Sequence, residues 1–288
     1  MNDSHNGGGV RSGIGGIGGC KKSVRIAFDT NPAGRTLYGR GLAPAYDSLM
    51  REDFSYERYA DYIEKIFNKY GTPPESLIAD LGCGTGSLCV ELAAKGYDVI
   101  GIDNSSYMLA EAREKAINAG FADILFLEQD ICAFELYGTV GALVSTIDSI
   151  NYITDKRRLH RLFKLAGNYL SSGGLFIFDL NTEYKLSKDI GNNIFYEISD
   201  DLCYLWQNCY NGVGKTSVFD LTLFSKEQDG RWRRFDEIHK QRAYAIKDIE
   251  YALRGTGLEI IGVYGFLSFS RPLKKAKKIS YILKKINI

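Results

Sequence analysis

The stretch Asp80-Leu81-Gly82-Cys83-Gly84-Thr85-Gly86 follows a short apolar run, residues 77–81, that predicts a buried strand. The apolar spacing after this stretch predicts a helix, with Ser87 as its N-terminal cap. A glycine-rich turn between strand and helix lets the backbone approach a ligand closely, and the helix N-terminus offers unpaired N–H groups. The stretch therefore predicts a ligand-binding loop in an α/β fold.

Strand and helix patterns alternate on both sides of this loop. Further strands are predicted at residues 98–103, 124–127, 140–147, 175–179, 258–264 and 279–283, with helices between them. Such alternation builds βαβ units whose right-handed crossovers give a mainly parallel sheet covered on both faces. We expect a doubly wound, Rossmann-like, mostly parallel seven-stranded sheet, which binds ligands at the carboxyl ends of its strands.

The glycines of the loop follow G-x-G-x-G, because Ser87 stands where the dinucleotide pattern G-x-G-x-x-G has its last glycine. An NAD site is therefore less favoured. Asp103 lies 21 residues after Gly82, at the end of the second strand, where nucleotide-binding α/β folds place a carboxylate for the ribose hydroxyls. The loop and this carboxylate together predict a nucleoside-containing ligand.

The sequence from about Ala45 onward resembles the class I S-adenosylmethionine-dependent methyltransferases. The resemblance rests on residues 80–86, on Gly-Ile-Asp-Asn-Ser at 101–105 and on Glu-Gln-Asp-Ile at 128–131. It implies that Gly82 and Gly84 hold the methionine part of the cofactor, Asp103 the ribose and Met108 the adenine face. The whole cofactor site implied by the resemblance is Asp80, Gly82, Cys83, Gly84, Gly86, Asp103, Asn104, Met108, Asp130 and Ile131. A methionine at helical spacing is just as often a core residue, and that alternative stays open for Met108.

A narrower resemblance links the chain to small-molecule methyltransferases of the glycine or amino-sugar N-methyltransferase type and to uncharacterised bacterial relatives. It is carried by residues 45–50, 148–152, 178–181 and 235–244. The Asn/Asp-Pro-Pro-Tyr tetrad of enzymes that methylate amino groups of nucleic acids is absent, because Ser149 follows Asp148. The resemblance implies a small-molecule acceptor, an amine or a hydroxyl.

Residues 184–244 interrupt the α/β alternation with aromatic extended runs, separated by the turn signals Asn211-Gly212 and Asp229-Gly230. We expect an antiparallel insertion after the fifth strand, which emerges at the ligand-binding end of the sheet and covers the acceptor as a lid. Because alternate residues of a strand share a face, Glu237 and His239 are expected to point together, and Arg242 to point the other way.

Three residues are candidates for the catalytic side of the site. His239 has the side chain suited to a general base near neutral pH, although a structural role is the slightly favoured alternative. Asp148 stands where the fourth strand opens on the methyl group, or else caps a turn. Tyr46 covers the cofactor, or else packs in the core. The sulfonium is itself reactive, so alignment and exclusion of water matter more than a strong base.

The composition narrows the classes of partner. A formal net charge of +1 gives no large field for a polyanion, so no nucleic-acid partner is expected. The six cysteines show no C-x-x-C pair and no metal-ligand spacing, so no metal site is expected. No apolar run is long enough to span a membrane, and the N-terminus lacks a secretory signal, so a cytoplasmic protein is expected.

The two ends of the chain are interpreted as peripheral. Residues 1–41 are rich in glycine and without periodicity, which predicts a flexible tail ahead of a methyltransferase domain at 42–288. The basic stretch 274–285 alternates lysines with apolar residues, as on the solvated face of an edge strand. Two rival functions remain open: an NAD- or nucleotide-sugar-dependent enzyme on a similar fold, and a non-catalytic cofactor-binding module.

Overall fold

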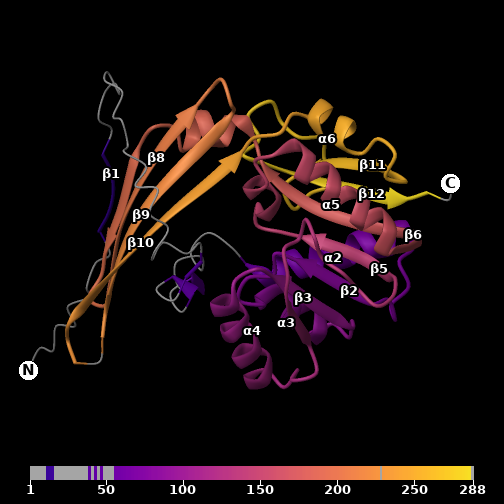
Figure 1. The fold of residues 1–288 in the computed structure, drawn as a ribbon, viewed down its shortest axis with the longest axis horizontal. Helices are drawn as coiled ribbons and strands as arrows, with labels where there is room; N and C mark the ends of the chain where they lie inside the picture. The colour runs from indigo at the N-terminus through magenta and orange to yellow at the C-terminus, as the bar shows by residue number, and fades with distance from the viewer. Residues whose placement is uncertain are drawn as a thin grey trace, which may run out of the picture.

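The computed structural model describes residues 11–15, 38–39, 42–43, 46–47, 55–227 and 229–286, with the backbone alone described at 11–15. Figure 1 shows a compact α/β body beside a second sheet of long strands. The helices are α2 (Tyr56–Tyr70), α3 (Ser87–Ala94), α4 (Ser106–Asn118), α5 (Lys156–Tyr169) and α6 (Ile246–Ala252), with short helical turns η1 (Ser149–Tyr152) and η2 (Lys185–Asp189). No helix among the described residues is long and apolar enough to cross a membrane.

Within the described part of the chain, the main sheet has seven strands in the order β11-β12-β6-β5-β2-β3-β4. Its strands are β2 (Ile78–Leu81), β3 (Val99–Asp103), β4 (Leu125–Glu128), β5 (Val140–Ser145), β6 (Leu170–Asn181), β11 (Leu258–Gly265) and β12 (Lys278–Lys285). The pairs among β2 to β6 are parallel, whereas β12 runs antiparallel to both of its neighbours. The predicted doubly wound, mostly parallel sheet is confirmed.

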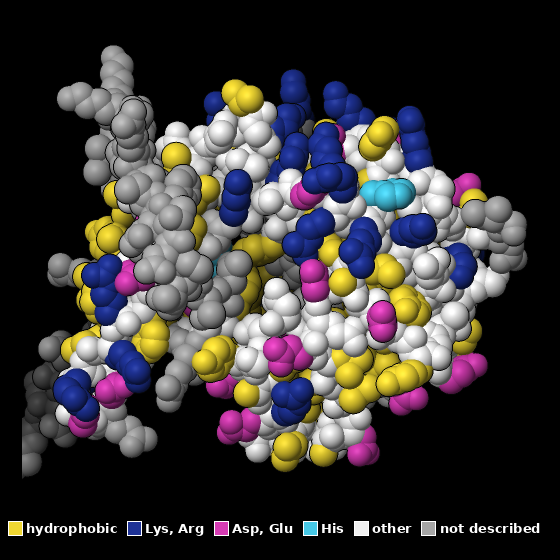
Figure 2. Space-filling view, in the orientation of Figure 1, with side chains coloured by type: hydrophobic (Ala, Val, Ile, Leu, Met, Phe, Trp, Pro, Cys, Tyr) yellow, Lys and Arg dark blue, Asp and Glu magenta, His cyan; other side chains and the backbone are white. Residues whose placement is uncertain are grey.

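Helices cover both faces of this sheet. Alternate residues of a strand face opposite ways, so Ile78 of β2 packs with α2, α3 and α4, while Ala79 and Leu81 pack with α5 and α6. The charged face of α5 is turned to solvent, and Figure 2 shows lysine and arginine side chains gathered over this part of the surface. The two apolar layers fix the strand ends at which the ligand loops emerge.

The inserted sheet has the order β1-β7-β8-β9-β10 and is antiparallel throughout. Its strands are β1 (Arg11–Gly15), β7 (Ile194–Ile198), β8 (Leu202–Asn211), β9 (Thr216–Lys226) and β10 (Trp232–Arg242). The turns between β8 and β9 and between β9 and β10 hold the two predicted turn signals. The predicted antiparallel insertion after the fifth strand is therefore present, and β10 lies at one edge of it.

The structure differs from expectation at both ends of the chain. Residues 11–15, predicted as part of a flexible tail, form β1, because the open edge of β7 supplies hydrogen-bonding partners that the sequence does not reveal. Apart from Tyr38 and Gly39, the rest of the predicted tail lies outside the described residues. The interpretation of 274–285 as an edge strand is wrong: β12 lies between β11 and β6, and β11 is the edge.

Two local predictions also need correction. Gly86, not Ser87, is the N-terminal cap residue of α3, because the chain enters the helix through a left-handed conformation with φ 70° that glycine adopts without strain. The fifth strand begins at Leu170 and runs through Gly173-Gly174, ahead of the predicted start at residue 175. Leu170 already has extended backbone and pairs with Val140, so helix α5 ends at Tyr169.

Candidate active site

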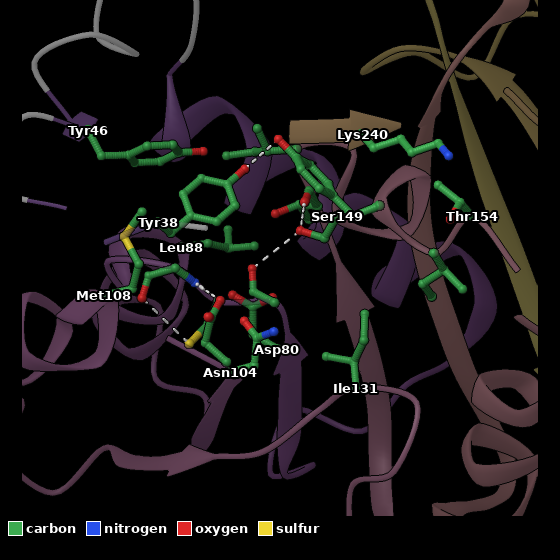
Figure 3. Close-up of a pocket in the computed structure, with 18 of the residues that line it drawn as sticks. Tyr38, Tyr46, Asp80, Leu88, Asn104, Met108, Ile131, Ser149, Thr154 and Lys240 are labelled. Atoms are coloured by element: carbon green, nitrogen blue, oxygen red, sulfur yellow. Dashed lines mark hydrogen bonds between the residues drawn. The ribbon is translucent and has the colours of Figure 1, made fainter. Parts of the chain in front are cut away.

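A pocket of about 440 Å³ opens at the carboxyl ends of β2, β3 and β5, where a doubly wound sheet is expected to bind ligands. Figure 3 shows Asp80, Asn104 and Met108 on one side of it, with the rings of Tyr38 and Tyr46 lying across from Asp80. Nine of the residues predicted from the sequence line this pocket: Tyr46, Asp80, Gly82, Cys83, Gly84, Asp103, Asn104, Met108 and Ile131. Gly86, Asp130, Asp148 and His239 are not among the lining residues.

The three glycines of the loop have different surroundings, although all three have positive φ. A side chain at Gly82 would meet Ser149 Oγ at 2.8 Å, whereas a side chain at Gly84 would enter open space. Gly86 packs against the Ala112 side chain and the Phe126 ring, which leaves no room for a Cβ atom. Gly84 is thus the glycine whose missing side chain leaves space for a ligand, and Gly86 serves the packing of α3.

Asp80 is a buried carboxylate on the pocket wall. Burial raises the pKa of its carboxyl to about 7. Its Oδ2 accepts a weak hydrogen bond from Cys89 Sγ at 3.5 Å, while its Oδ1 has no hydrogen-bond partner among the described residues. A buried carboxylate oxygen without a partner costs free energy, and a cation placed in the pocket would relieve that cost.

Asp103, at the end of β3, holds two backbone segments of the pocket in place, the glycine-rich loop and the start of α4. Its two oxygens accept hydrogen bonds from the backbone N–H groups of Gly84 and Ser105, both at 2.9 Å. Burial raises the pKa of this carboxyl, and the hydrogen bonds from the backbone oppose that shift. Ser105 also caps α4, by accepting a hydrogen bond from Met108 N.

The other predicted cofactor residues divide into two groups. The buried Met108 side chain and the Ile131 side chain line the pocket directly. The Asp130 carboxylate is instead bound by the Arg158 guanidinium at 2.7 and 2.9 Å, and it accepts from Cys132 N. Asp130 therefore fixes the backbone that carries Ile131, and it is its partner Arg158, not Asp130 itself, that lines the pocket.

Three tyrosines, Tyr38, Tyr46 and Tyr152, enclose the end of the pocket across from Asp80, and a fourth, Tyr56, lines the pocket beside Ser87. Burial raises the pKa of each phenol, so all four are protonated at neutral pH. Tyr38 is central: its ring meets those of Tyr46 and Tyr152, both at 5.7 Å between ring centroids, and its hydroxyl donates to Tyr152 Oη at 2.7 Å. This end of the pocket is aromatic and offers hydroxyl hydrogen bonds.

Residues 38 and 39 are functional positions that the sequence reasoning missed. The N–H groups of Tyr38 and Gly39 donate to the two carboxylate oxygens of Glu237, at 3.0 and 2.9 Å. The Tyr38 carbonyl accepts from Ser105 Oγ at 2.7 Å. A clasp of residues 38 and 39 thus joins strand β10 to the loop that follows Asp103. Glu237 lies 199 positions from Tyr38 in the chain, and no local pattern signals such a contact.

Glu237 and His239 point the same way from β10, as the alternation of a strand predicted, and both are buried. His239 Nε2 lies 2.9 Å from Glu237 Oε2, so a neutral imidazole carries its proton on Nε2. His239 Nδ1 then accepts from the Tyr152 hydroxyl at 3.3 Å. Arg242 turns away and donates to the Thr154 carbonyl. His239 is therefore connected to the pocket through Tyr152.

Asp148 is not among the residues that line the pocket, and its carboxylate is held in an ion-pair network. Lys278 Nζ donates to its Oδ1 at 2.8 Å, and Gln241 Nε2 of β10 donates to its Oδ2. Burial alone would raise the pKa of this carboxyl, but the charges of Lys278 and Lys185, together with the hydrogen bonds from Lys278 and Gln241, outweigh it and hold the pKa below its usual value. Asp148 stays ionised and ties the inserted sheet to β12.

Comparisons with known proteins support the geometry of the pocket. A family described as a methyltransferase domain matches residues 78–174. The chain is 30% identical over 241 residues to "Putative methyltransferase GWCH70_2453" of Geobacillus sp. (strain WCH70), covering 83% of this chain and 96% of that one.

Two solved structures share the fold. An S-adenosylmethionine-dependent methyltransferase from Clostridium acetobutylicum ATCC 824 has a TM-score of 0.78 and 32% identity, over 85% of this chain and 98% of that chain. The sugar N-methyltransferase KedS8 from Streptoalloteichus sp. ATCC 53650 has a TM-score of 0.69 and 18% identity, over 88% of this chain and 98% of that chain. These similarities favour methyl transfer over the nicotinamide and nucleotide-sugar alternatives.

Proposed function

The chain belongs to the S-adenosylmethionine-dependent methyltransferases, and we propose that it methylates a small-molecule acceptor, an amine or a hydroxyl, bound at the tyrosine end of the pocket. The observation that carries this proposal is the enclosure of that end by three half-buried tyrosines, Tyr38, Tyr46 and Tyr152, and by the clasp of residues 38 and 39. A wall of this kind, mainly aromatic with a few polar groups, suits a small organic molecule. Bulky acceptors would have to displace it.

The residues at the other end of the pocket, around Asp80 and the glycine-rich loop, fit the cofactor. S-adenosylmethionine carries a cationic amino group, and Asp80 offers a buried carboxylate oxygen without a partner among the described residues. We assign the methionine part to Asp80 and to the backbone of Gly82, Cys83 and Gly84, beside the open space at Gly84. Asp103 and Asn104 would hold the ribose, and Met108 and Ile131 would contact the adenine. When bound, the cofactor supplies a methyl group on a positively charged sulfur.

The Tyr152 hydroxyl is the group on the acceptor side that is best placed to receive a proton. The chain of hydrogen bonds Tyr38–Tyr152–His239–Glu237 runs in one direction, each hydroxyl or N–H donating to the next acceptor. A hydroxyl acceptor would lose its proton to this chain, with His239 as the base behind Tyr152. A neutral amine needs no base before transfer, so the same residues would only orient it.

Tyr46 and Asp148 receive positioning roles in this proposal. Tyr46 closes the pocket wall beside Tyr38, and Asp148 holds β10 over the site through Gln241. The similar fold of the sugar N-methyltransferase KedS8 supports an amine as one of the two acceptor classes of this proposal.

The proposal is tested by incubating the purified full chain with methyl-labelled S-adenosylmethionine and a panel of small amines, hydroxyl compounds and carboxylic acids. We expect label in a small-molecule product. Tyr152→Phe should lower turnover about tenfold or more, since the hydrogen-bonded chain is broken. The matched control Tyr137→Phe, a fully exposed tyrosine, should have no effect. Label confined to macromolecules, or equal turnover in both variants, would contradict the proposal.

A further inference from the structure

The turn that follows β5 is strained. Ile147 and Asp148 have φ of 53° and 56°, in the left-handed region that residues other than glycine seldom adopt. For a β-branched residue such as Ile147 this conformation is an outlier, and it persists only where the surroundings hold it. Ile147 lines the pocket directly after the strand end. A strained backbone at this position calls for a specific restraint.

Asp179, near the end of β6, supplies that restraint. Its carboxylate is fully buried, and its two oxygens accept hydrogen bonds from Ile147 N and Asp148 N, both at 2.8 Å. Tyr59 Oη donates to the same carboxylate at 2.5 Å, and Lys278 Nζ lies 3.7 Å away. Two charge-assisted hydrogen bonds to adjacent amides offset the strain of the turn.

This restraint determines where the Ile147 carbonyl points. The peptide bonds here are trans, so the carbonyl of Ile147 points opposite to the N–H of Asp148, away from Asp179. The neighbouring carbonyls are occupied: Thr146 O accepts from Ser149 Oγ, and Asp148 O accepts from Asn151 N. No donor to Ile147 O is found among the described residues. The turn thus leaves one backbone acceptor open on the pocket side.

We propose that Ile147 O accepts a hydrogen bond from an N–H of the methyl acceptor, and that Asp179 is the positioning residue that aims this oxygen. The proposal rests on the proposed function and narrows its acceptor to a primary or secondary amine. A carbonyl oxygen can only accept, so it selects a group that carries a hydrogen.

The amine must be uncharged to attack the methyl group, and this favours a neutral carbonyl over a carboxylate as its hydrogen-bond partner. A carboxylate in contact would stabilise the ammonium form of an amine, which has no lone pair to attack with. The carboxylate of the turn, Asp148, is held by Lys278 and Gln241 and is not among the groups that line the pocket. A carbonyl dipole binds a neutral amine while leaving its lone pair free, and its attraction grows as the nitrogen becomes positive during transfer.

Sinefungin tests this inference without knowledge of the acceptor, because it replaces the methylsulfonium of the cofactor with a carbon that bears an amine. Its affinity is compared by calorimetry with that of S-adenosylhomocysteine, which has neither methyl nor amine. We expect the wild-type chain to prefer sinefungin by about tenfold or more, the scale of one hydrogen bond to a charged group. If S-adenosylhomocysteine binds and the two affinities are equal, this inference fails while the proposed function stands. If neither ligand binds, both fail.

Variants test whether the preference for sinefungin arises from the turn that Asp179 holds. In Asp179→Asn the preference for sinefungin should fall to about twofold or less, with the affinity for S-adenosylhomocysteine within a few-fold of wild type. Tyr59→Phe is the matched control: it removes a hydrogen bond to the same carboxylate without touching the turn, and should keep the preference.

The double variant Ile147→Gly/Asp179→Asn separates the position of the Ile147 carbonyl from the negative charge of Asp179. It also tests the positioning role of Asp179 if Asp179→Asn alone does not fold. Glycine adopts the left-handed turn without Asp179, so the preference should return although the negative charge is gone. A folded Asp179→Asn that keeps the preference, or a double variant that lacks it, would overturn the role of Asp179.

Discussion

Asp80 shows at the scale of a single residue how a binding site costs stability. An acid whose pKa rises on folding, here from 3.8 to about 7 through burial, binds more protons in the folded than in the unfolded state between these pH values. The folded state therefore loses stability as the pH rises from about 4 to about 7. In the proposed site the same carboxylate gains a partner when the cationic amino group of the cofactor arrives.

Asp80→Asn is predicted to raise stability and lower binding together. Above pH 7 the free energy of unfolding of the ligand-free protein should rise by on the order of 1–4 kcal/mol, because the buried charge is gone. Wild-type affinity for S-adenosylmethionine should increase from pH 5.5 to pH 8 as Asp80 ionises, while the affinity of the Asn variant stays flat. Chemical denaturation and calorimetry at several pH values measure both effects. A variant that binds as tightly as wild type at pH 8 would remove Asp80 from the amino-group site.

Gly84 and Gly120 form a matched pair for testing the loop. Both have positive φ, 54° and 84°, and a Cβ atom at either position meets nothing within 4 Å. An alanine at either position should lower the free energy of unfolding by a similar amount, about 1 kcal/mol, through backbone strain. Only Gly84→Ala is expected to weaken S-adenosylhomocysteine binding, by about tenfold or more, because its methyl group enters the pocket. Equal binding by the two variants would place the cofactor elsewhere.

At the scale of elements, β10 connects the two sheets at several points. Glu237 holds the clasp of residues 38 and 39, His239 meets Tyr152, and Gln241 meets Asp148. Glu237→Gln replaces one accepting oxygen with a donor that opposes an N–H of the clasp. Hydrogen exchange at the Tyr38 and Gly39 amides should speed up about tenfold or more, with the amides of β5 and β6 unchanged. Unaltered exchange at both amides would show that Glu237 does not hold the clasp.

The elements that the sequence predicted well are those defined by local patterns. The strand before Gly82 and the turn signal Asn211-Gly212 each depend on residues close together in the chain. Placing β12 in the interior of the sheet depends on strand pairing, and its lysines read locally as an edge. One of them, Lys278, is buried beside Asp148 and Asp179, an environment that only the folded chain creates.

At the scale of the whole molecule, the site joins segments that are far apart in the chain. The cofactor end could be predicted because the loop 80–86 and Asp103 belong to one βαβ unit with fixed geometry. The acceptor end could not, since Tyr38, Tyr152 and His239 meet only when the inserted sheet docks on the main one. Ile147 lies in the turn after β5 and Asp179 on the neighbouring strand β6, and no sequence pattern marks the strain that links them.

Calorimetric titration of the full chain with S-adenosylhomocysteine and with NAD tests the central claim, that this pocket is the cofactor site, most directly. We expect the titration to give one S-adenosylhomocysteine bound per chain and no heat from NAD. Asp103→Ala should weaken binding by roughly 1–3 kcal/mol, with Asp103→Asn losing less because one acceptor oxygen remains. Binding of NAD in place of S-adenosylhomocysteine, or wild-type affinity in a folded Asp103→Ala variant, would contradict the assignment of this pocket.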